Sequence, residues 1–304
     1  MNEYLIVDAH IHTYPRPEIG IQAMGGEKRA EHAGTIEELL SFMKETGISY
    51  AVMMNFTPLK DMRDAAYTKI PSDLPEEKRK AAESEIEATM LGRLERRNRW
   101  TCDVGKEHPE LVPFIGLDNN VQPESMVKEM EDKITNHGAK GLKIHFASQR
   151  FFANDRILWP AYAKAEELGT PIMFHGGRFF DMEDPVYARP KLFHDLLSDF
   201  PRLNAVMAHL GGIEFIDEAL ELAEKYPNLN FDCCGIIAPG RGFSDDEAVG
   251  TIRTFGVERV MFGSDWPFVD PRSSIERIKT LGFTEEEKKK ILGENAIRIY
   301  QIRQ

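Results

Sequence analysis

Hydrophobic residues in this chain gather into short runs that alternate with longer amphipathic segments. Eight runs are apolar enough to form strands that are buried on both faces, as in a parallel sheet covered by helices. They lie at residues 4–12, 49–56, 112–118, 139–145, 171–177, 203–212, 229–235 and 259–265. Helical spacing occurs between or after them, at residues 35–47, 75–98, 123–136, 156–168, 191–200, 213–226, 245–255, 273–281 and 284–300. The pattern predicts an α/β protein.

The number of strands favours one architecture. Eight strands that alternate with helices favour a closed (β/α)8 TIM barrel over an open doubly wound sheet. The length of 304 residues suits a single barrel, so we expect one domain over residues 1–304. No GxGxxG follows the first strand and no GxxxxGK[ST] occurs. The nucleotide-binding alternatives therefore lack their fingerprints.

The longest interval between predicted strands runs from residue 57 to residue 108. It holds charged, alanine-rich helical sequence and no strand-like run. Long insertions in barrel enzymes sit in the loops that follow strands. We therefore predict a helical insertion after the second strand, which covers the mouth of the barrel or forms a subunit contact.

Candidate metal ligands stand at the ends of four predicted strands. The first strand ends in His10 and His12, whose side chains point to one face because strand residues i and i+2 do so. His175, His209 and Asp265 end the fifth, sixth and eighth strands. A pair of histidines alone is a weak signal, since imidazole is also an ordinary hydrogen-bonding group. The recurrence at strand ends, where barrels place their chemistry, indicates a catalytic metal site.

The order of the strands assigns these residues to roles. In a closed barrel the first and eighth strands are neighbours, so Asp265 would stand beside His10 and His12, and His175 would face them. Imidazoles and one carboxylate suit one divalent ion, with zinc as the first choice and manganese as the alternative. His209 could be a further ligand, but we prefer it as the group that orients water or a substrate oxygen and moves protons. Asp265 would also accept a proton.

Other polar residues are candidates for contacts with a substrate. Lys143 and His145 share one face of the fourth strand, and either could point into the barrel. Lys143 could carry a carboxyl group that bridges two metals, although a substrate or packing role is favoured. Arg178 follows the fifth strand and could pair with a substrate carboxylate, or it could be an ordinary surface arginine. Asp8 is interpreted as a brace for a neighbouring imidazole.

Composition limits the partners and the cellular compartment that we expect. Hydrophobic residues make up 42% of the chain and charged residues 29%, and the formal net charge is -12. That charge argues against a nucleic-acid partner, because phosphate binding needs clustered basic residues. Three cysteines form no disulfide framework, and no apolar run approaches the roughly 20 residues that span a bilayer. We expect a cytoplasmic protein with a small-molecule substrate, no membrane partner, and a homodimer as one possible assembly.

The motifs together resemble those of a known superfamily. They are DAHIH, GLKIH, PIMFHGG, AHLGG, FGSDWP and a late ENAIRIY. The set is similar to the amidohydrolase superfamily, and closest to the amidohydrolase-related branch with aminocarboxymuconate semialdehyde decarboxylase, resorcylate-type decarboxylases and several lactone hydrolases. The resemblance implies that His10, His12, His175 and Asp265 hold the metal and that His209 is a nearby catalytic residue.

Three functions follow as hypotheses. The first is a metal-dependent hydrolase that acts on a small carboxylate-bearing lactone, ester or amide through metal-activated water. The alternative is a metal-dependent, non-oxidative decarboxylase of an aromatic or muconate-type acid. The third is a barrel that binds a partner without catalysis, since a fold alone does not establish activity. The intact set of five strand-end residues argues against this last hypothesis.

Overall fold

The strands form one parallel sheet in the computed structural model, which describes residues 4–179, 185–240 and 242–303. Eight strands pair in chain order from β1 to β8. Their bounds are β1 Ile6–Ile11, β2 Ile48–Met54, β3 Leu111–Gly116, β4 Gly141–Ile144, β5 Ile172–Phe174, β6 Ala205–Met207, β7 Leu229–Asp232 and β8 Val260–Met261. Every strand residue is buried except two of β2, as expected for a sheet that helices cover. The predicted (β/α)8 barrel is confirmed.

Hydrogen bonds between β1 and the segment that directly follows β8 close the ring. The backbone N–H of Ala9 donates to the Phe262 carbonyl at 2.9 Å, and that of Asp265 donates to the His10 carbonyl at 2.8 Å. Asp8 adds a side-chain link, because its Oδ1 accepts the N–H of Ser264 at 2.9 Å. Burial raises the pKa of Asp8 to about 7. The closure fixes the segment that carries Asp265 against the strand that carries the histidine pair.

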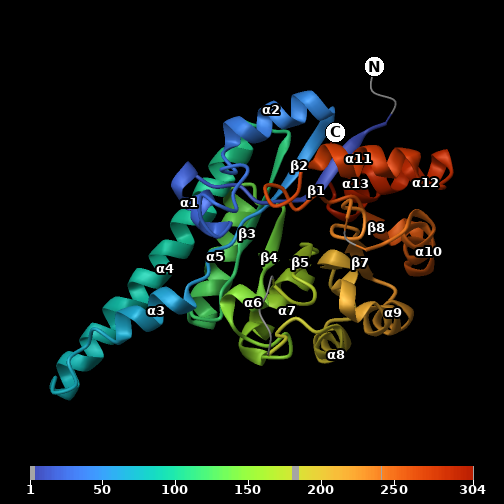
Figure 1. Ribbon diagram of the computed structural model, residues 1–304. Coiled ribbons are helices and arrows are strands. Elements are labelled where there is room, and N and C mark those ends of the chain that lie inside the picture. Colours follow the sequence, from blue (N-terminus) through green and yellow to red (C-terminus); the bar gives the residue numbers. More distant parts are fainter. Residues whose placement is uncertain (1–3, 180–184, 241, 304) are drawn as a thin grey trace.

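Helices surround the sheet (Figure 1). The α-helices are α1 Pro17–Ala23, α2 Ile36–Thr46, α3 Lys60–Tyr67, α4 Glu76–Glu107, α5 Pro123–Asn136, α6 Phe146–Gln149, α7 Trp159–Leu168, α8 His194–Asp199, α9 Ile216–Lys225, α10 Asp245–Phe255, α11 Pro271–Thr280, α12 Glu285–Lys289 and α13 Asn295–Ile299. Short 3-10 segments are η1 Arg156–Leu158, η2 Pro190–Phe193, η3 Ala208–Gly211, η4 Ile213–Phe215 and η5 Val257–Arg259, and η6 Lys290–Glu294 is a π-helical turn. Within the described ranges, none of these helices combines the length and the apolar character needed to cross a bilayer.

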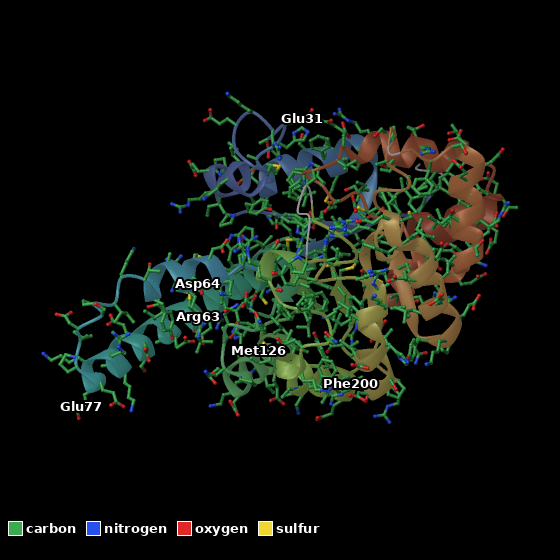
Figure 2. All side chains as sticks on the ribbon, turned by 60° about the horizontal axis from the view of Figure 1, so that its bottom comes forward. Glu31, Arg63, Asp64, Glu77, Met126 and Phe200 are labelled. Atoms are coloured by element: carbon green, nitrogen blue, oxygen red, sulfur yellow. The ribbon has the colours of Figure 1, made fainter. Side chains whose placement is uncertain are left out.

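The interval from residue 57 to residue 108 consists largely of α3 and α4, which form an arm that leaves the barrel (Figure 1). Figure 2 shows Arg63, Asp64 and Glu77 along this arm. Only the second part of α4 is buried, at Met90, Leu94, Asn98, Thr101, Cys102 and Val104. Their spacing of mostly three or four residues makes one stripe of the helix. This stripe packs on the barrel, so the end of the insertion lies close to the sheet.

Helices α1 and α6 lie outside the ranges that the sequence pattern predicts as helical. Prolines and a pair of glycines interrupt helical spacing in residues 13–34, yet α1 occupies Pro17–Ala23. Pro17 stands at the start of this helix, where its fixed φ is compatible and no N–H is needed. The next helix, α2, begins where the sequence predicts, because Thr35 and Glu38 form a capping box.

Candidate active site

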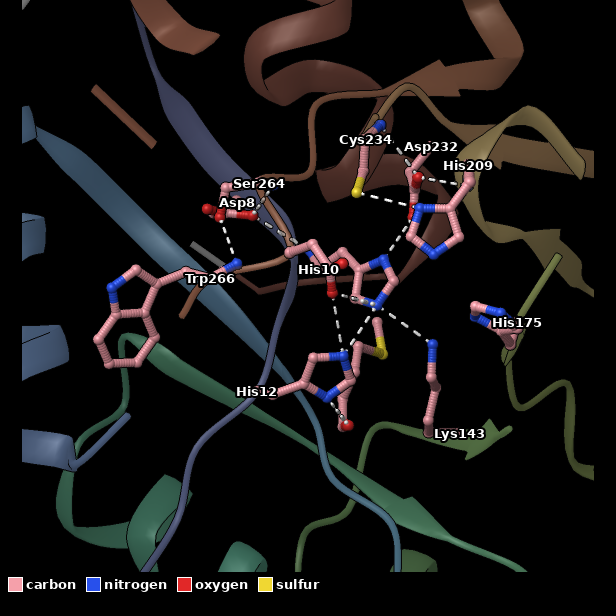
Figure 3. A network of polar contacts seen from close by, with 12 residues as sticks. Asp8, His10, His12, Lys143, His175, His209, Asp232, Cys234, Ser264 and Trp266 are labelled. Atoms are coloured by element: carbon pink, nitrogen blue, oxygen red, sulfur yellow. Dashed lines mark hydrogen bonds and ion pairs between the residues drawn. The ribbon is translucent and has the colours of Figure 1, made fainter. Parts of the chain in front are cut away.

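Three predicted metal ligands meet at the carboxyl end of the barrel. The Nε2 atoms of His10 and His12 lie 3.2 Å apart. The Oδ1 atom of Asp265 lies 3.2 Å from the His12 nitrogen and 3.6 Å from the His10 nitrogen. The two rings meet edge to face, and Figure 3 shows Lys143 and His209 beside the His10 ring. Two strands at the seam of the barrel therefore bring together residues that are more than 250 positions apart.

The Nδ1 atom of each ring is engaged in a hydrogen bond. Nδ1 of His10 donates to Oδ2 of Asp232 at 2.7 Å, and Nδ1 of His12 donates to the Met54 carbonyl at 2.7 Å. Burial lowers the pKa of both imidazoles, and the nearby Lys143 charge lowers that of His10 further. A neutral imidazole has a single N–H, which these acceptors consume. Each Nε2 therefore presents a lone pair.

The resulting donor set fits a divalent cation. Two imidazole lone pairs and a carboxylate oxygen converge, and such groups repel one another unless a positive charge lies between them. Burial tends to raise the pKa of Asp265, but its contact with His12 and the surrounding imidazoles outweigh burial and hold the pKa well below the ordinary value. Asp265 also adopts a left-handed backbone conformation, with φ of 64°, which residues with a Cβ rarely adopt away from functional sites.

His175 lines the active-site cavity but does not belong to the close group of His10, His12 and Asp265. Its Nε2 donates to the Arg178 carbonyl at 3.1 Å, which leaves Nδ1 as the free lone pair. Its ring stacks on that of His145, with centroids 3.9 Å apart. Among the described residues, the groups with potential ligand atoms within 4.8 Å of one another do not include His175. Its predicted role as a metal ligand stays a prediction.

His209 is held by backbone and side-chain contacts next to the metal-ligand group. Its φ of 57° is left-handed, and its backbone N–H donates to Oδ1 of Asp232 at 2.8 Å. The ring lies 5.3 Å from that of His10 and 5.1 Å from that of His175, between centroids. Nδ1 contacts the Cys234 thiol at 3.1 Å. The other ring nitrogen, Nε2, remains available to the cavity, which His209 lines.

Asp232 was not recognised in the sequence, although it links His10 and His209. One of its oxygens binds the His10 ring and the other accepts the His209 backbone N–H. It also accepts the N–H of Cys234 at 3.2 Å. Burial raises the pKa of Asp232, and the His209 contact opposes that rise. The available signal was a carboxylate inside the apolar run of residues 229–235, where the observed strand β7 ends.

Lys143 and His145 both face the centre of the barrel. The Nζ atom of Lys143 lies 3.2 Å from Nε2 of His10, and the side chain is fully buried. Burial lowers the pKa of Lys143 to about 8. His145 is buried against Phe56 and His175, with ring centroids 4.8 Å and 3.9 Å away. His145 lines the active-site cavity, whereas Lys143 lies behind the lining next to His10, and the substrate contacts predicted for both residues stay predictions.

Paired glycines allow the loops after β5 and β6 to touch. A Cβ built on Gly176 would lie 2.4 Å from the Ala208 carbonyl oxygen, and one on Gly212 would lie 2.5 Å from Cα of Gly177. Both distances are shorter than any Cβ contact tolerates. The HGG and HLGG motifs are therefore a packing requirement, which lets His175 and His209 approach each other.

Replacing Gly176 with alanine is expected to destabilise the protein by about 1–3 kcal/mol, because the added methyl group meets backbone atoms that cannot rotate away. Urea denaturation measures this change. Gly250→Ala is the matched control, since Gly250 lies in α10 with nothing within 4 Å of a built Cβ. That substitution should stabilise by about 0.5–1 kcal/mol. Equal stability of Gly176→Ala and the wild type would disprove the close-packing argument.

The site opens into a cavity of about 560 Å³. Arg178 lies on its wall, as expected for a substrate contact, but it forms an ion pair with Glu214 at 3.3 Å. Two further wall residues were not anticipated: Tyr14, which follows the histidine pair, and Arg97, which belongs to α4. Burial raises the pKa of Tyr14 to about 12, so its phenol stays neutral at physiological pH.

An eight-stranded parallel barrel with histidines and aspartates at the carboxyl ends of its strands is typical of barrel enzymes. The family model described as amidohydrolase matches residues 7–302. The chain therefore belongs to the amidohydrolase family and is an enzyme of that family. This finding confirms the resemblance seen in the motifs.

Several relatives and solved structures with similar chains are decarboxylases. Gamma-resorcylate decarboxylase of Rhizobium sp. is 22% identical over 223 residues, which cover 59% of this chain and 67% of the relative. The 2-amino-3-carboxymuconate-6-semialdehyde decarboxylase of Dictyostelium discoideum is 26% identical over 235 residues, which cover 66% of this chain and 64% of the relative.

A solved structure of 5-carboxyvanillate decarboxylase from Novosphingobium aromaticivorans contains manganese and 4-hydroxy-3-methoxy-5-nitrobenzoic acid. It superposes with a TM-score of 0.68 at 14% identity and covers 98% of this chain and 97% of that chain. The likeness establishes the shared barrel.

Proposed function

We propose that this protein is a metal-dependent decarboxylase that removes CO₂ from a small aromatic or unsaturated carboxylic acid without oxidation. The observation that supports this proposal is the agreement of the named relatives, which are decarboxylases, with a cavity lined by convergent imidazoles. The sequence motifs alone placed hydrolysis first. The relatives favour the decarboxylase alternative.

His10, His12 and Asp265 would hold the divalent ion, with His175 as the predicted fourth ligand. A bound ion of this kind polarises substrate oxygens as a Lewis acid. Zinc is our first choice, and the manganese in the 5-carboxyvanillate decarboxylase structure supports manganese as the alternative. Asp232 and the Met54 carbonyl orient the two histidine rings, which is the usual role of acceptors behind metal-bound imidazoles.

Aromatic side chains form a surface for a planar substrate next to the ligands. The rings of Phe56 and Phe268 lie edge-on to His12, with centroids 5.8 Å and 5.9 Å away. Edge and face contacts of this kind suit a flat ring. The cavity is large enough for a benzoic acid derivative, whose carboxylate would face the imidazoles.

His209 is the proposed proton donor. Decarboxylation breaks the bond between the ring carbon and the carboxylate carbon, CO₂ leaves, and the bonding electron pair remains on the ring carbon. A proton from Nε2 of His209 then forms the new C–H bond at this carbon of the substrate. The His209 imidazole regains its proton from solvent. The contact with Cys234 fixes the other nitrogen, and burial raises the pKa of that thiol well above its ordinary value, so it stays protonated.

A substrate screen tests the proposal. The purified protein, loaded with Zn²⁺ or Mn²⁺, is incubated with 2,6-dihydroxybenzoate, 5-carboxyvanillate, and lactones and esters of similar size. We expect release of CO₂ from an aromatic acid, and in D₂O the incorporation of deuterium at the carbon that lost its carboxyl group. Hydrolysis of a lactone or ester without any decarboxylation would overturn the proposal and restore the hydrolase hypothesis.

A further inference from the structure

Among the described residues, three arginines line the active-site cavity, and two of them are neutralised there. Arg150 pairs with Asp61 at 3.1 Å, and Arg178 pairs with Glu214 at 3.3 Å. All four of these side chains belong to the cavity wall. Arg97 has no carboxylate partner within the described part of the chain. Within residues 4–179, 185–240 and 242–303, Arg97 is thus the cavity arginine whose charge no carboxylate balances.

The surroundings of Arg97 are polar but neutral. Its Nη2 donates to the Thr13 carbonyl and, at 3.1 Å, to the amide oxygen of Asn55. The guanidinium lies over the rings of Trp100 and Tyr14, 4.7 Å and 5.5 Å from their centroids. Its Nη1 is buried and has no hydrogen-bond partner among the described residues.

An unmatched cation in such a place is costly. Burial lowers the pKa of Arg97 to about 10, yet at neutral pH the group still carries its charge. Ring faces and neutral acceptors compensate a guanidinium only in part, and a carboxylate is its usual partner in buried settings. No described side chain supplies one, and Arg97 lies on the wall of the cavity, where an anionic group of a bound molecule can provide it.

Both hydrogen-bond acceptors of Arg97 are sequence neighbours of residues that form or orient the metal-ligand group. Thr13, whose carbonyl it contacts, directly follows His12. Asn55, the second acceptor, directly follows Met54, whose carbonyl fixes the His12 ring. The arginine therefore faces the same chamber as the ligands, although it comes from the insertion helix α4.

We infer that Arg97 binds a second anionic group of the substrate, so that this enzyme selects acids with two anionic groups over acids with one. This inference deepens the proposed function and rests on it. One carboxylate would face the metal ligands, and the other anionic group would pair with the guanidinium. The insertion between β2 and β3 is then part of the substrate site, and Arg97 determines specificity.

Calorimetric titration of the metal-loaded protein tests the inference with two probes, benzene-1,3-dicarboxylate and benzoate. We expect the wild type to bind the dicarboxylate at least about tenfold more tightly than benzoate, because one additional charge-assisted contact has about that effect. Arg97→Gln should lose this preference while its affinity for benzoate stays within about twofold. The matched control is Arg93→Gln, an exposed arginine one turn away on α4, which should behave as the wild type.

The outcomes separate binding from a merely positioning role. If Arg97 only braces Thr13 and Asn55, Arg97→Gln will weaken both probes by the same factor, and this result would overturn the inference. Equal affinity of the wild type for both probes would overturn it too. Should Arg97→Gln fail to fold, Arg97→Lys decides, because lysine keeps the charge but not the planar fork. An intermediate preference supports the inference, and an unchanged one contradicts it.

The titration requires no turnover, so its result is independent of the reaction. Arg97-dependent binding of the dicarboxylate without decarboxylation in the screen would keep the anion site and reject the decarboxylase. Decarboxylation of an acid with two anionic groups at an unchanged kcat/KM in Arg97→Gln would keep the decarboxylase and reject the anion site.

Discussion

Asp265→Ala is expected to lose its bound metal. The carboxylate oxygen lies within 3.6 Å of both Nε2 atoms of the histidine pair, and it is the negatively charged member of this donor set. Its removal leaves two neutral imidazoles, which hold a divalent ion much more weakly. Mass spectrometric metal analysis of protein dialysed against trace Zn²⁺ should find about one ion per chain in the wild type and close to none in the variant. His10→Ala should give the same result.

The control for this experiment is Asp246→Ala, an exposed aspartate in the first turn of α10. It should retain the wild-type metal content. Circular dichroism shows whether Asp265→Ala keeps its fold, because alanine is less compatible than aspartate with the positive φ at this position. A folded Asp265→Ala protein that binds zinc as tightly as the wild type would disprove the assigned ligand set.

His209→Asn is expected to keep its metal and lose most of its activity. The ring approaches the ligand group, but its Nδ1 contacts Cys234 and its backbone is held by Asp232, so its other nitrogen is free to exchange a proton. Loss of a general acid typically slows a reaction about 10²–10⁴-fold. We expect kcat for the acid identified by the screen to fall within that range, with unchanged metal content. Asparagine tolerates the left-handed backbone of this position, so the loop should persist.

His108→Asn serves as the control for this variant, because His108 lies at the end of α4 and outside the cavity wall. It should leave kcat unchanged. Loss of metal together with activity in His209→Asn would reassign the residue as a ligand. An unchanged kcat would remove it from the mechanism.

The sequence by itself determined the barrel and the residues at its mouth. Strand periodicity and burial are local properties, and the apolar runs of all eight strands can be recognised without knowledge of the fold. The placement of His10 and His12 on one face follows from the repeat of two residues in a strand. Closure of eight strands then puts Asp265 beside them, because the first and last strands must be neighbours.

Only the tertiary structure decided how the residues at the mouth are partnered. Asp232 binds His10 across 222 positions of the chain, and no local pattern encodes such a contact. The same holds for Arg178, which sequence proximity to His175 made a candidate anion binder and which Glu214 neutralises. Arg97 looked like one charge among many on a solvated helix, and only the packing of α4 brings it to the cavity. A charged side chain is compensated by the groups that lie near it in space. The sequence around an ion-pair partner does not show which distant residue the fold brings next to it.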